Sequence, residues 1–165
     1  MKFLRATHLV VMVKGTKEHA EDIKQQTAAF ISQELKMELS LEKTMVTHIS
    51  EGFAFLGHRI QLMPDRNGKP TVYTLPTKES LMNVKEKIKR ITSRCTIPLS
   101  LKEILGQINP ILRGWANYYR YDAAKSTFAY LDAYTWRRVY RWMRKKYAKV
   151  PVKMLKRTKF PDWCF

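Results

Sequence analysis

The sequence is poor in cysteine and has no long apolar segment. Only two of its 165 residues are cysteines, Cys95 and Cys164, and they lie far apart, which argues against a disulfide framework and fits a reducing cytoplasm. The longest unbroken apolar run is residues 9–13, whereas a membrane-spanning helix needs about 20 such residues. The first residues show no signal-peptide pattern. We therefore expect a cytoplasmic protein with no membrane partner.

Motifs that bind metals or phosphates through fixed spacings are also missing. The four histidines and two cysteines do not follow any metal-ligand spacing, and neither a Gly-rich phosphate loop nor a G-x-S-x-G elbow occurs. Acidic residues of 61–165 are scattered singly, so no carboxylate pair is available for two-metal catalysis. From the residues alone we predict no catalytic residues, no metal ligands and no cofactor.

Positive charge is what the sequence has in excess, and it is distributed unevenly. The chain has 31 Lys and Arg against 14 Asp and Glu, a formal net charge of +17. Residues 1–60 are nearly neutral, with 8 basic and 7 acidic side chains, whereas 61–165 hold 23 and 7. The segment 137–159 has 11 basic residues and no acidic one. This pattern predicts a polyanionic partner and either two functional units or one unit with a nearly neutral annex.

The first 76 residues are predicted to form a small sheet with one helix. Residues 8–14 are β-branched and short, which indicates a buried strand, and a helix is expected from Thr16 to about Lys36. Further strands are expected over 42–49, 52–62 and 71–75, and the turn-rich cluster 64–70 predicts a hairpin between the last two.

Residues 77–148 are predicted to be all-α, a bundle of three or four helices. The first helix begins at Thr77 and places Leu81, Val84, Ile88 and Ile91 on one face. The others are expected over 100–106, over 110–121 with Pro110 as first residue and Asn109 as cap, and over 125–148. The predicted class is therefore α+β, with domains 1–76 and 77–148 and a basic tail, 149–165.

Positions plotted at about 100° per residue place basic side chains opposite the apolar faces of the last two helices. Core packing is the simplest interpretation of four aromatic residues on the apolar side: Trp115, Tyr118, Tyr119 and Trp142. Others lie nearer the charged arcs and are candidates to stack on bases: Tyr121, Tyr134, Tyr140 and Tyr147. A solvated surface is the alternative interpretation of the basic faces, but like charges without acidic partners repel one another. We favour phosphate binding, with RNA or DNA left open. The predicted binding residues are Arg113, Asn117, Arg120, Arg137, Arg138, Arg141, Arg144 and Lys145.

The segment 112–120, LRGWANYYR, resembles the signature of the maturase-specific region of group II intron reverse transcriptases. Nine consecutive residues with aromatics at fixed places make the match specific, and residues 109–111 and 128–138 fit the same family. Upstream, residues 9–16 and 39–44 are similar to the end of the polymerase palm, and 53–60 to the strand that grips the primer. The resemblance covers about residues 4–148.

This resemblance implies a palm remnant over 1–76 and a maturase-specific thumb over 77–148. In the family the thumb binds structured intron RNA and supports its splicing. Phe55, Leu56 and Gly57 would then be primer-grip-like residues. The implied partners are structured RNA, above all group II intron RNA, a DNA/RNA heteroduplex, and an upstream reverse-transcriptase polypeptide.

One departure from the family bears on catalysis. A Tyr-Ala-Asp-Asp turn precedes the strand 9–13 in the family, and its aspartates hold the metal ions. Here the aspartate positions fall on Thr7 and His8, which do not replace two carboxylates around Mg²⁺. We therefore expect no polymerase activity from the chain alone, and Mg²⁺ only if a missing catalytic portion completes the site. The alternatives are a non-autonomous or decayed piece of an RNA-directed DNA polymerase that acts with an upstream polypeptide, and a general basic nucleic-acid-binding protein.

Overall fold

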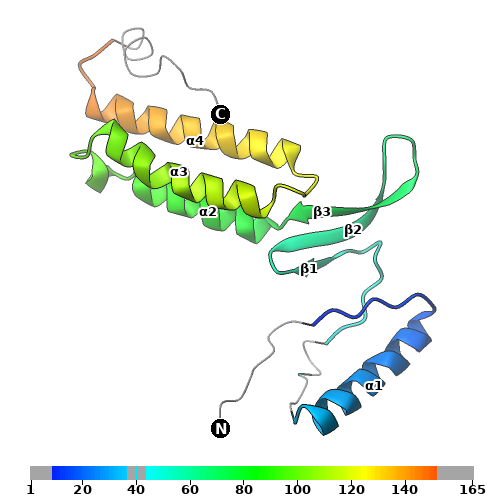
Figure 1. Ribbon diagram of the computed structural model, residues 1–165. Helices are drawn as coiled ribbons and strands as arrows, with labels where there is room; N and C mark the ends of the chain where they lie inside the picture. Colours follow the sequence, from blue (N-terminus) through cyan, green and yellow to red (C-terminus); the bar gives the residue numbers. More distant parts are fainter. Residues whose placement is uncertain (1–8, 37–39, 41–43, 152–165) are drawn as a thin grey trace. The chain divides into compact units, whose positions relative to one another are not determined.

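The computed structural model describes residues 9–36, 40 and 44–151 and confirms the predicted α+β class (Figure 1). The chain divides into two compact units, Met1–Tyr73 and Thr74–Phe165, which are described separately. Every buried hydrophobic side chain among the described residues belongs to the second unit. The hydrophobic core is therefore the core of the helical part.

Helix α1 (Lys17–Glu34) lies in the first unit and confirms the predicted helix. It begins where expected, because the hydroxyl of Thr16 accepts a hydrogen bond from the backbone N–H of His19 at 3.3 Å. No residue of α1 is buried. Its apolar positions, Phe30 among them, therefore stay at least partly in contact with solvent.

The strands predicted over 8–14 and 42–49 are wrong in the parts that the structure describes. Residues 9–14 form no strand, and Met12 is 72% exposed. A strand needs a neighbour that pairs with its backbone groups, and none of the described strands pairs with this segment. Residues 44–49 form no strand either, and the N–H of Thr44 donates to the carbonyl of Ser40 at 3.0 Å. His8 and residues 42–43 lie outside the described residues.

The described strands form one antiparallel sheet in the order β1 (Phe53–Phe55), β2 (His58–Pro64) and β3 (Pro70–Pro76). The single strand predicted over 52–62 is instead a hairpin, in which Phe55 pairs with His58. Leu56 (φ 47°) and Gly57 (φ 81°) both adopt the left-handed region, as a two-residue hairpin turn requires. Leucine seldom takes this conformation, so the sequence contained no clear signal for the turn.

The connection between β2 and β3 confirms the turn predicted over 64–70. The carboxylate of Asp65 accepts hydrogen bonds from the backbone N–H groups of Asn67 (2.7 Å) and Lys69 (2.9 Å). Gly68 has a φ of 77°, which a residue with a Cβ adopts only at a cost. Asp65, through its side-chain acceptor, and Gly68, through its positive φ, thus contribute to the turn as these residue types commonly do.

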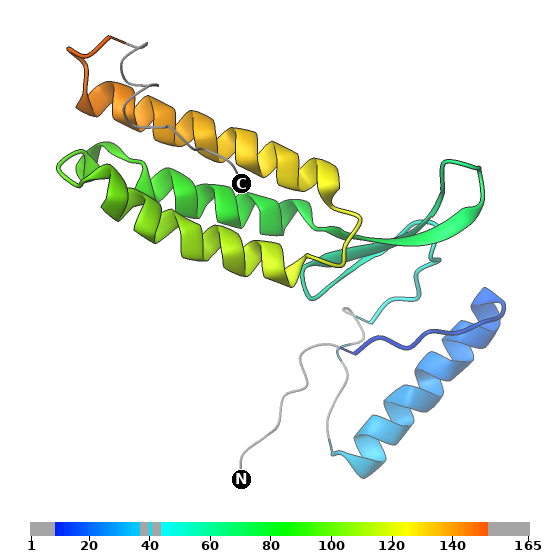
Figure 2. The ribbon, with the colours of Figure 1, turned by 45° about the horizontal axis from the view of Figure 1, so that its top comes forward.

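The second unit contains three long helices, α2 (Lys78–Ile91), α3 (Leu101–Tyr118) and α4 (Lys125–Lys146), with a short 3₁₀ helix, η1 (Arg94–Thr96), between the first two. Helix α2 packs against both α3 and α4 (Figure 2). Thr77 caps α2 as predicted, accepting a hydrogen bond from the N–H of Ser80 at 3.2 Å. The fully buried core of the bundle consists of Val84, Ile88, Ile104, Ile108, Leu131, Val139, Trp142 and Met143.

The break predicted in the middle of α3 is wrong, because the helix continues through Pro110. Its start is strong: Ser100 and Glu103 form a reciprocal capping box. Ile104 and Ile108 are fully buried, and Ile108 continues the helical period into the break that was expected between 106 and 110. Pro110 is exposed, so the hydrogen bond that it cannot donate is lost on the solvent side. Core packing therefore outweighs the local preference of proline.

Candidate nucleic-acid interface

The highest density of positive charge in the described chain lies on the second half of α4. Val139, Trp142 and Met143 point into the core and thereby fix the outward direction of the residues between them. Six of the ten residues from 137 to 146 are basic and none is acidic: Arg137, Arg138, Arg141, Arg144, Lys145 and Lys146. Asp132, one turn earlier, is partly buried, and this burial raises the pKa of its carboxyl group. The surface therefore presents cations with almost no compensating charge on the same helix.

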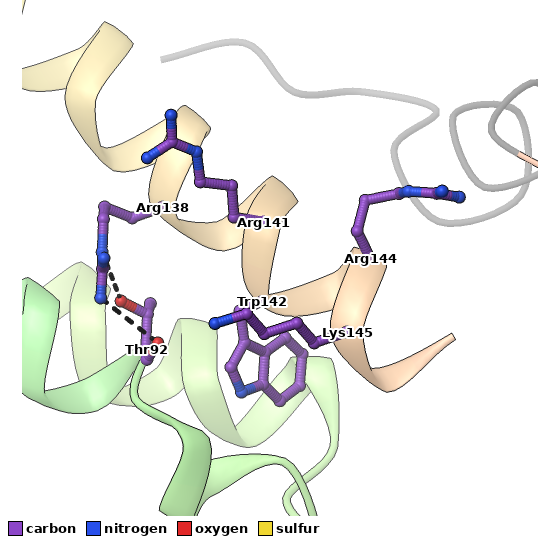
Figure 3. Close-up of a pocket in the computed structure, with 6 residues that line it drawn as sticks. All are labelled: Thr92, Arg138, Arg141, Trp142, Arg144 and Lys145. Atoms are coloured by element: carbon purple, nitrogen blue, oxygen red, sulfur yellow. Dashed lines mark hydrogen bonds between the residues drawn. The ribbon is translucent and has the colours of Figure 1, made fainter. Parts of the chain in front are cut away.

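A shallow hollow lies on this part of α4, at its junction with the end of α2 (Figure 3). Thr92 contributes from the end of α2, and Trp142 forms part of its lining. The other lining residues are four of the predicted binding residues: Arg138, Arg141, Arg144 and Lys145. Helical spacing placed Arg141, Arg144 and Lys145 on one helix face, and Arg138 was named as a binding residue beside them. The structure adds the α2 side of the hollow.

Arg138 is tied to the end of α2. Its Nε donates to the hydroxyl of Thr92 at 3.0 Å, and its Nη2 donates to the carbonyl of Lys89 at 3.1 Å. These bonds satisfy groups at the C-terminus of α2, where carbonyls lack helical partners and a cation is favourable. Arg138 thus joins two helices in addition to its place beside the hollow. On the helical plot it lies at about 260° from Val139, at the border between the faces, which was the available signal.

Lys146 has a structural role that sequence reasoning missed. Its ammonium donates to the carbonyls of Ile97 (2.8 Å) and Pro98 (3.2 Å), and also to that of Leu99. On the helical plot Lys146 lies at about 340°, within the apolar arc. A cation on the inner side of a helix needs acceptors there, so this angle was the available signal for the role of Lys146.

Arg141 and Lys145 are the exposed cations of the hollow. Within the described residues neither has a hydrogen bond or an ion pair, and both line the hollow together with Trp142 (Figure 3). Their neighbours are partly engaged: Arg144 donates to the carbonyl of Val150 at 3.3 Å, and Arg137 to that of Ala133 at 3.1 Å. Arg141 and Lys145 are therefore the side chains best placed to meet an anionic ligand.

The predicted residues on and after α3 form a separate group. Arg113 and Asn117 are exposed on α3, and the guanidinium of Arg120 lies 4.4 Å from the ring centre of Tyr121. The C-terminal end of α3 lies beside the start of α2, because Tyr119 bonds to Ser80. The hollow lies near the start of α3, because Lys146 bonds to Ile97. The two groups of basic residues are therefore at opposite ends of the bundle (Figure 1). The structure does not bring all eight predicted residues into one site.

The segment 112–120 contributes to packing at the end of α3. The hydroxyl oxygen of Ser80 accepts hydrogen bonds from the indole of Trp115 (3.1 Å) and from the hydroxyl of Tyr119 (2.6 Å). Burial raises the pKa of Tyr119, which keeps this donor protonated. Tyr119 and Trp142 are buried as predicted and Trp115 is half-buried, but Tyr118 is 54% exposed and its predicted core position is wrong. The next residue, Tyr119, is the one that faces α2, where its hydroxyl donates to Ser80.

The primer-grip-like residues lie in the first unit. Phe55 ends β1 and is half-buried, whereas Leu56 and Gly57 form the turn into β2. Thr7 and His8 lie outside the described residues. Elsewhere, the described segments contain no group of three His, Cys, Asp or Glu residues that could hold a metal ion. None of the helices in the described part is both long and apolar enough to cross a bilayer.

Residues 81–160 match the family described as "Group II intron, maturase-specific domain". The chain is also 33% identical over 162 residues to "Group II intron-encoded protein LtrA" of Lactococcus lactis subsp. cremoris, in an alignment that covers 82% of this chain and 27% of that protein. The chain therefore contains a group II intron maturase-specific domain. A shorter match, 35% identical over 78 residues, relates it to "Protein YkfC" of Escherichia coli (strain K12), with 47% of this chain and 20% of that protein covered.

The maturase-specific match contains the hollow. It runs from within α2 to beyond α4, so the hollow and the end of α3 both lie inside it. The chain spans 27% of the length of the Lactococcus relative.

Proposed function

We propose that the helical unit of this chain binds structured group II intron RNA through the basic face of α4, and that this binding supports splicing. The observation that carries the proposal is the exposed pair Arg141 and Lys145, which has no acidic partner among the described residues and lines a hollow inside the maturase-specific domain. When such cations neutralise RNA phosphates, the counterions held by the RNA are released, and this release makes binding favourable. The thumb role of residues 77–148 is part of this proposal.

We further propose that the chain has no polymerase activity of its own and needs no cofactor. The support is the donor chemistry: Thr7 and His8 stand where the family resemblance places two aspartates, and a hydroxyl and an imidazole do not fit Mg²⁺, which prefers charged oxygen ligands. Intron RNA is proposed over a DNA/RNA heteroduplex as the ligand. If a heteroduplex of the same length displaced the intron RNA as well as unlabelled intron RNA does, this preference would be contradicted.

The test is the affinity for a group II intron RNA, measured by fluorescence anisotropy over a range of salt concentrations. With about six phosphate contacts, the logarithm of the association constant should fall with the logarithm of the salt concentration with a slope of about −5. The double variant Arg141→Gln/Lys145→Gln should bind more weakly and show a shallower slope by about two. A matched control removes two exposed charges near the other end of the bundle, Lys78→Gln/Lys125→Gln. An equal loss in the control would show that charge alone, and not this face, determines binding.

A second candidate function is that the chain associates, through its first unit, with an upstream reverse-transcriptase polypeptide and acts together with it. The observation in its favour is exposed apolar surface in residues 9–12 and on α1, including Met12 and Phe30, in a unit with no buried hydrophobic residue among those described. The test mixes the chain with the part of the Lactococcus relative that precedes the aligned segment. Co-elution and template-dependent primer extension would support this function, and separate elution would contradict it.

A further inference from the structure

The seam between α2 and α4 carries a line of polar and aromatic side chains longer than the hollow. On α4 they recur every three or four positions, which places them on one side of the helix. We call this line the seam stripe; it consists of Tyr130, Tyr134, Arg138, Arg141 and Lys145. Fifteen residues separate its ends, which corresponds to about 22 Å along the helix. The hollow occupies one end of the stripe and the two tyrosines the other.

Lys85 of α2 holds the tyrosine end in place. Its ammonium lies 2.9 Å from the hydroxyl oxygen of Tyr130 but 5.1 Å from the centre of that ring, so it sits nearer the hydroxyl than the ring centre. The hydroxyl of Tyr134 donates to the carbonyl of Lys85 at 3.4 Å. Tyr130 nevertheless remains 43% exposed. The result is an aromatic ring that is fixed in position yet accessible to solvent.

Fixed, exposed rings and unpaired cations serve different parts of a nucleotide. A base stacks on an aromatic face only when it is not already stacked inside a duplex, whereas Arg and Lys contact phosphates in any nucleic acid. The seam stripe offers the ring of Tyr130 at one end and the charges of Arg141 and Lys145 at the other. Lys85 adds a further charge beside the ring.

We propose that the seam stripe binds an unpaired RNA segment, with a base stacked on Tyr130 and the following phosphates on Arg141 and Lys145. This inference rests on the proposed RNA-binding function and names the form of RNA that the face selects. The stripe is about 22 Å long, so the phosphates that reach Arg141 and Lys145 lie several nucleotides along the strand from the stacked base. A short oligonucleotide is therefore a sufficient probe.

The experiment compares two probes with the full chain: a single-stranded RNA of about ten nucleotides of mixed sequence and the same strand paired with its complement. We expect tighter binding of the single strand. Tyr130→Leu should weaken single-strand binding about tenfold, since one base stack contributes on this order, and should leave duplex binding unchanged. Tyr130→Phe keeps the ring and should retain most of the affinity. The matched control is Tyr121→Leu, which removes a ring that is 84% exposed near the end of α3.

The outcomes separate this inference from the proposed function. If Arg141→Gln weakens both probes while Tyr130→Leu weakens neither, the face binds RNA but the inference is overturned. A loss with Tyr121→Leu in place of Tyr130→Leu also overturns it, because the stacking site would lie at the other end of the bundle. If Arg141→Gln changes neither affinity, the proposed function itself fails. A circular-dichroism melt of each variant confirms that it is folded.

Discussion

The ammonium of Lys146 lies 2.8 Å from the carbonyl oxygen of Ile97, and this contact joins the last turn of α4 to the segment that precedes α3. One turn earlier, the indole of Trp142 donates to the hydroxyl of Thr96 at 3.1 Å. The C-terminal end of α4 is thus held to the same segment at two places. Neighbouring basic residues of α4 therefore differ in role: Lys146 contributes to packing, whereas Lys145 is exposed.

Lys146→Met should lower the free energy of unfolding by about 1.5–3 kcal/mol, because it removes charge-assisted hydrogen bonds and leaves backbone carbonyls without their donor. Urea denaturation followed by circular dichroism measures this change. Lys145→Met is the matched control, and it should alter stability by no more than about 0.5 kcal/mol, since Lys145 is exposed. Equal effects of the two variants would contradict the assignment of Lys146 to packing.

Arg138→Gln and Arg141→Gln should affect different properties. Arg138 bonds to Thr92 and Lys89, so its replacement should destabilise the bundle by about 1–2 kcal/mol and lower Tm. Arg141→Gln should leave Tm unchanged and weaken RNA binding. Thermal melts and anisotropy titrations of both variants provide the comparison. A fall in Tm with Arg141→Gln would show that Arg141, too, is part of the packing.

Pro110→Ala should stabilise the protein. Alanine restores an N–H that can donate to the carbonyl of Gly106 and it is the better helix former, while the unfolded chain regains some entropy, so the expected gain is about 1–2 kcal/mol. Pro110 is exposed, and the new side chain needs no space in the core. The measurement is the midpoint of urea denaturation. A loss of stability would indicate that α3 depends on the proline ring.

The capping box of α3 should make stability depend on pH. The pKa of Glu103 lies below its ordinary value of 4.5, because its carboxylate accepts hydrogen bonds from Ser100. The bond from the side chain of Ser100 has the larger effect, and the bond from its backbone N–H the smaller one. A lowered carboxyl pKa contributes stability that is present above about pH 4.5 and is lost as the pH falls through the pKa of the folded state. Wild type should therefore melt above Glu103→Gln at about pH 7, and the two Tm values should converge as the pH falls through the pKa of Glu103 in the folded state, which lies below 4.5. A constant difference across this range would contradict the assignment.

The sequence predicted those elements whose signals are local. Thr16 and Thr77 cap their helices through their own side chains, and Asp65 and Gly68 determine the β2–β3 turn through theirs. The basic face of α4 followed from helical spacing in the same way. These features depend on a few consecutive residues, so periodicity and turn chemistry were sufficient to find them.

Features that depend on distant residues were not predicted. Residues 9–13 have the composition of a strand but no pairing partner among the described strands, and composition does not reveal a partner. Pro110 indicated a helix boundary, but the buried Ile104 and Ile108 continue the helix. The roles of Arg138 and Lys146 required knowing which carbonyls lie beside α4.

The contacts that tie α4 to the rest of the bundle have a consequence for the order of folding. They join residues 45 to 49 positions apart, as in Lys85 to Tyr130, Thr96 to Trp142 and Ile97 to Lys146. No shorter stretch of chain can make them. During synthesis, α2 and α3 therefore reach the end of the ribosome tunnel before the helix that completes their core. We infer that the bundle assembles as one cooperative step when α4 arrives, because a chain that ends before Val139 still lacks Val139, Trp142 and Met143 of the core.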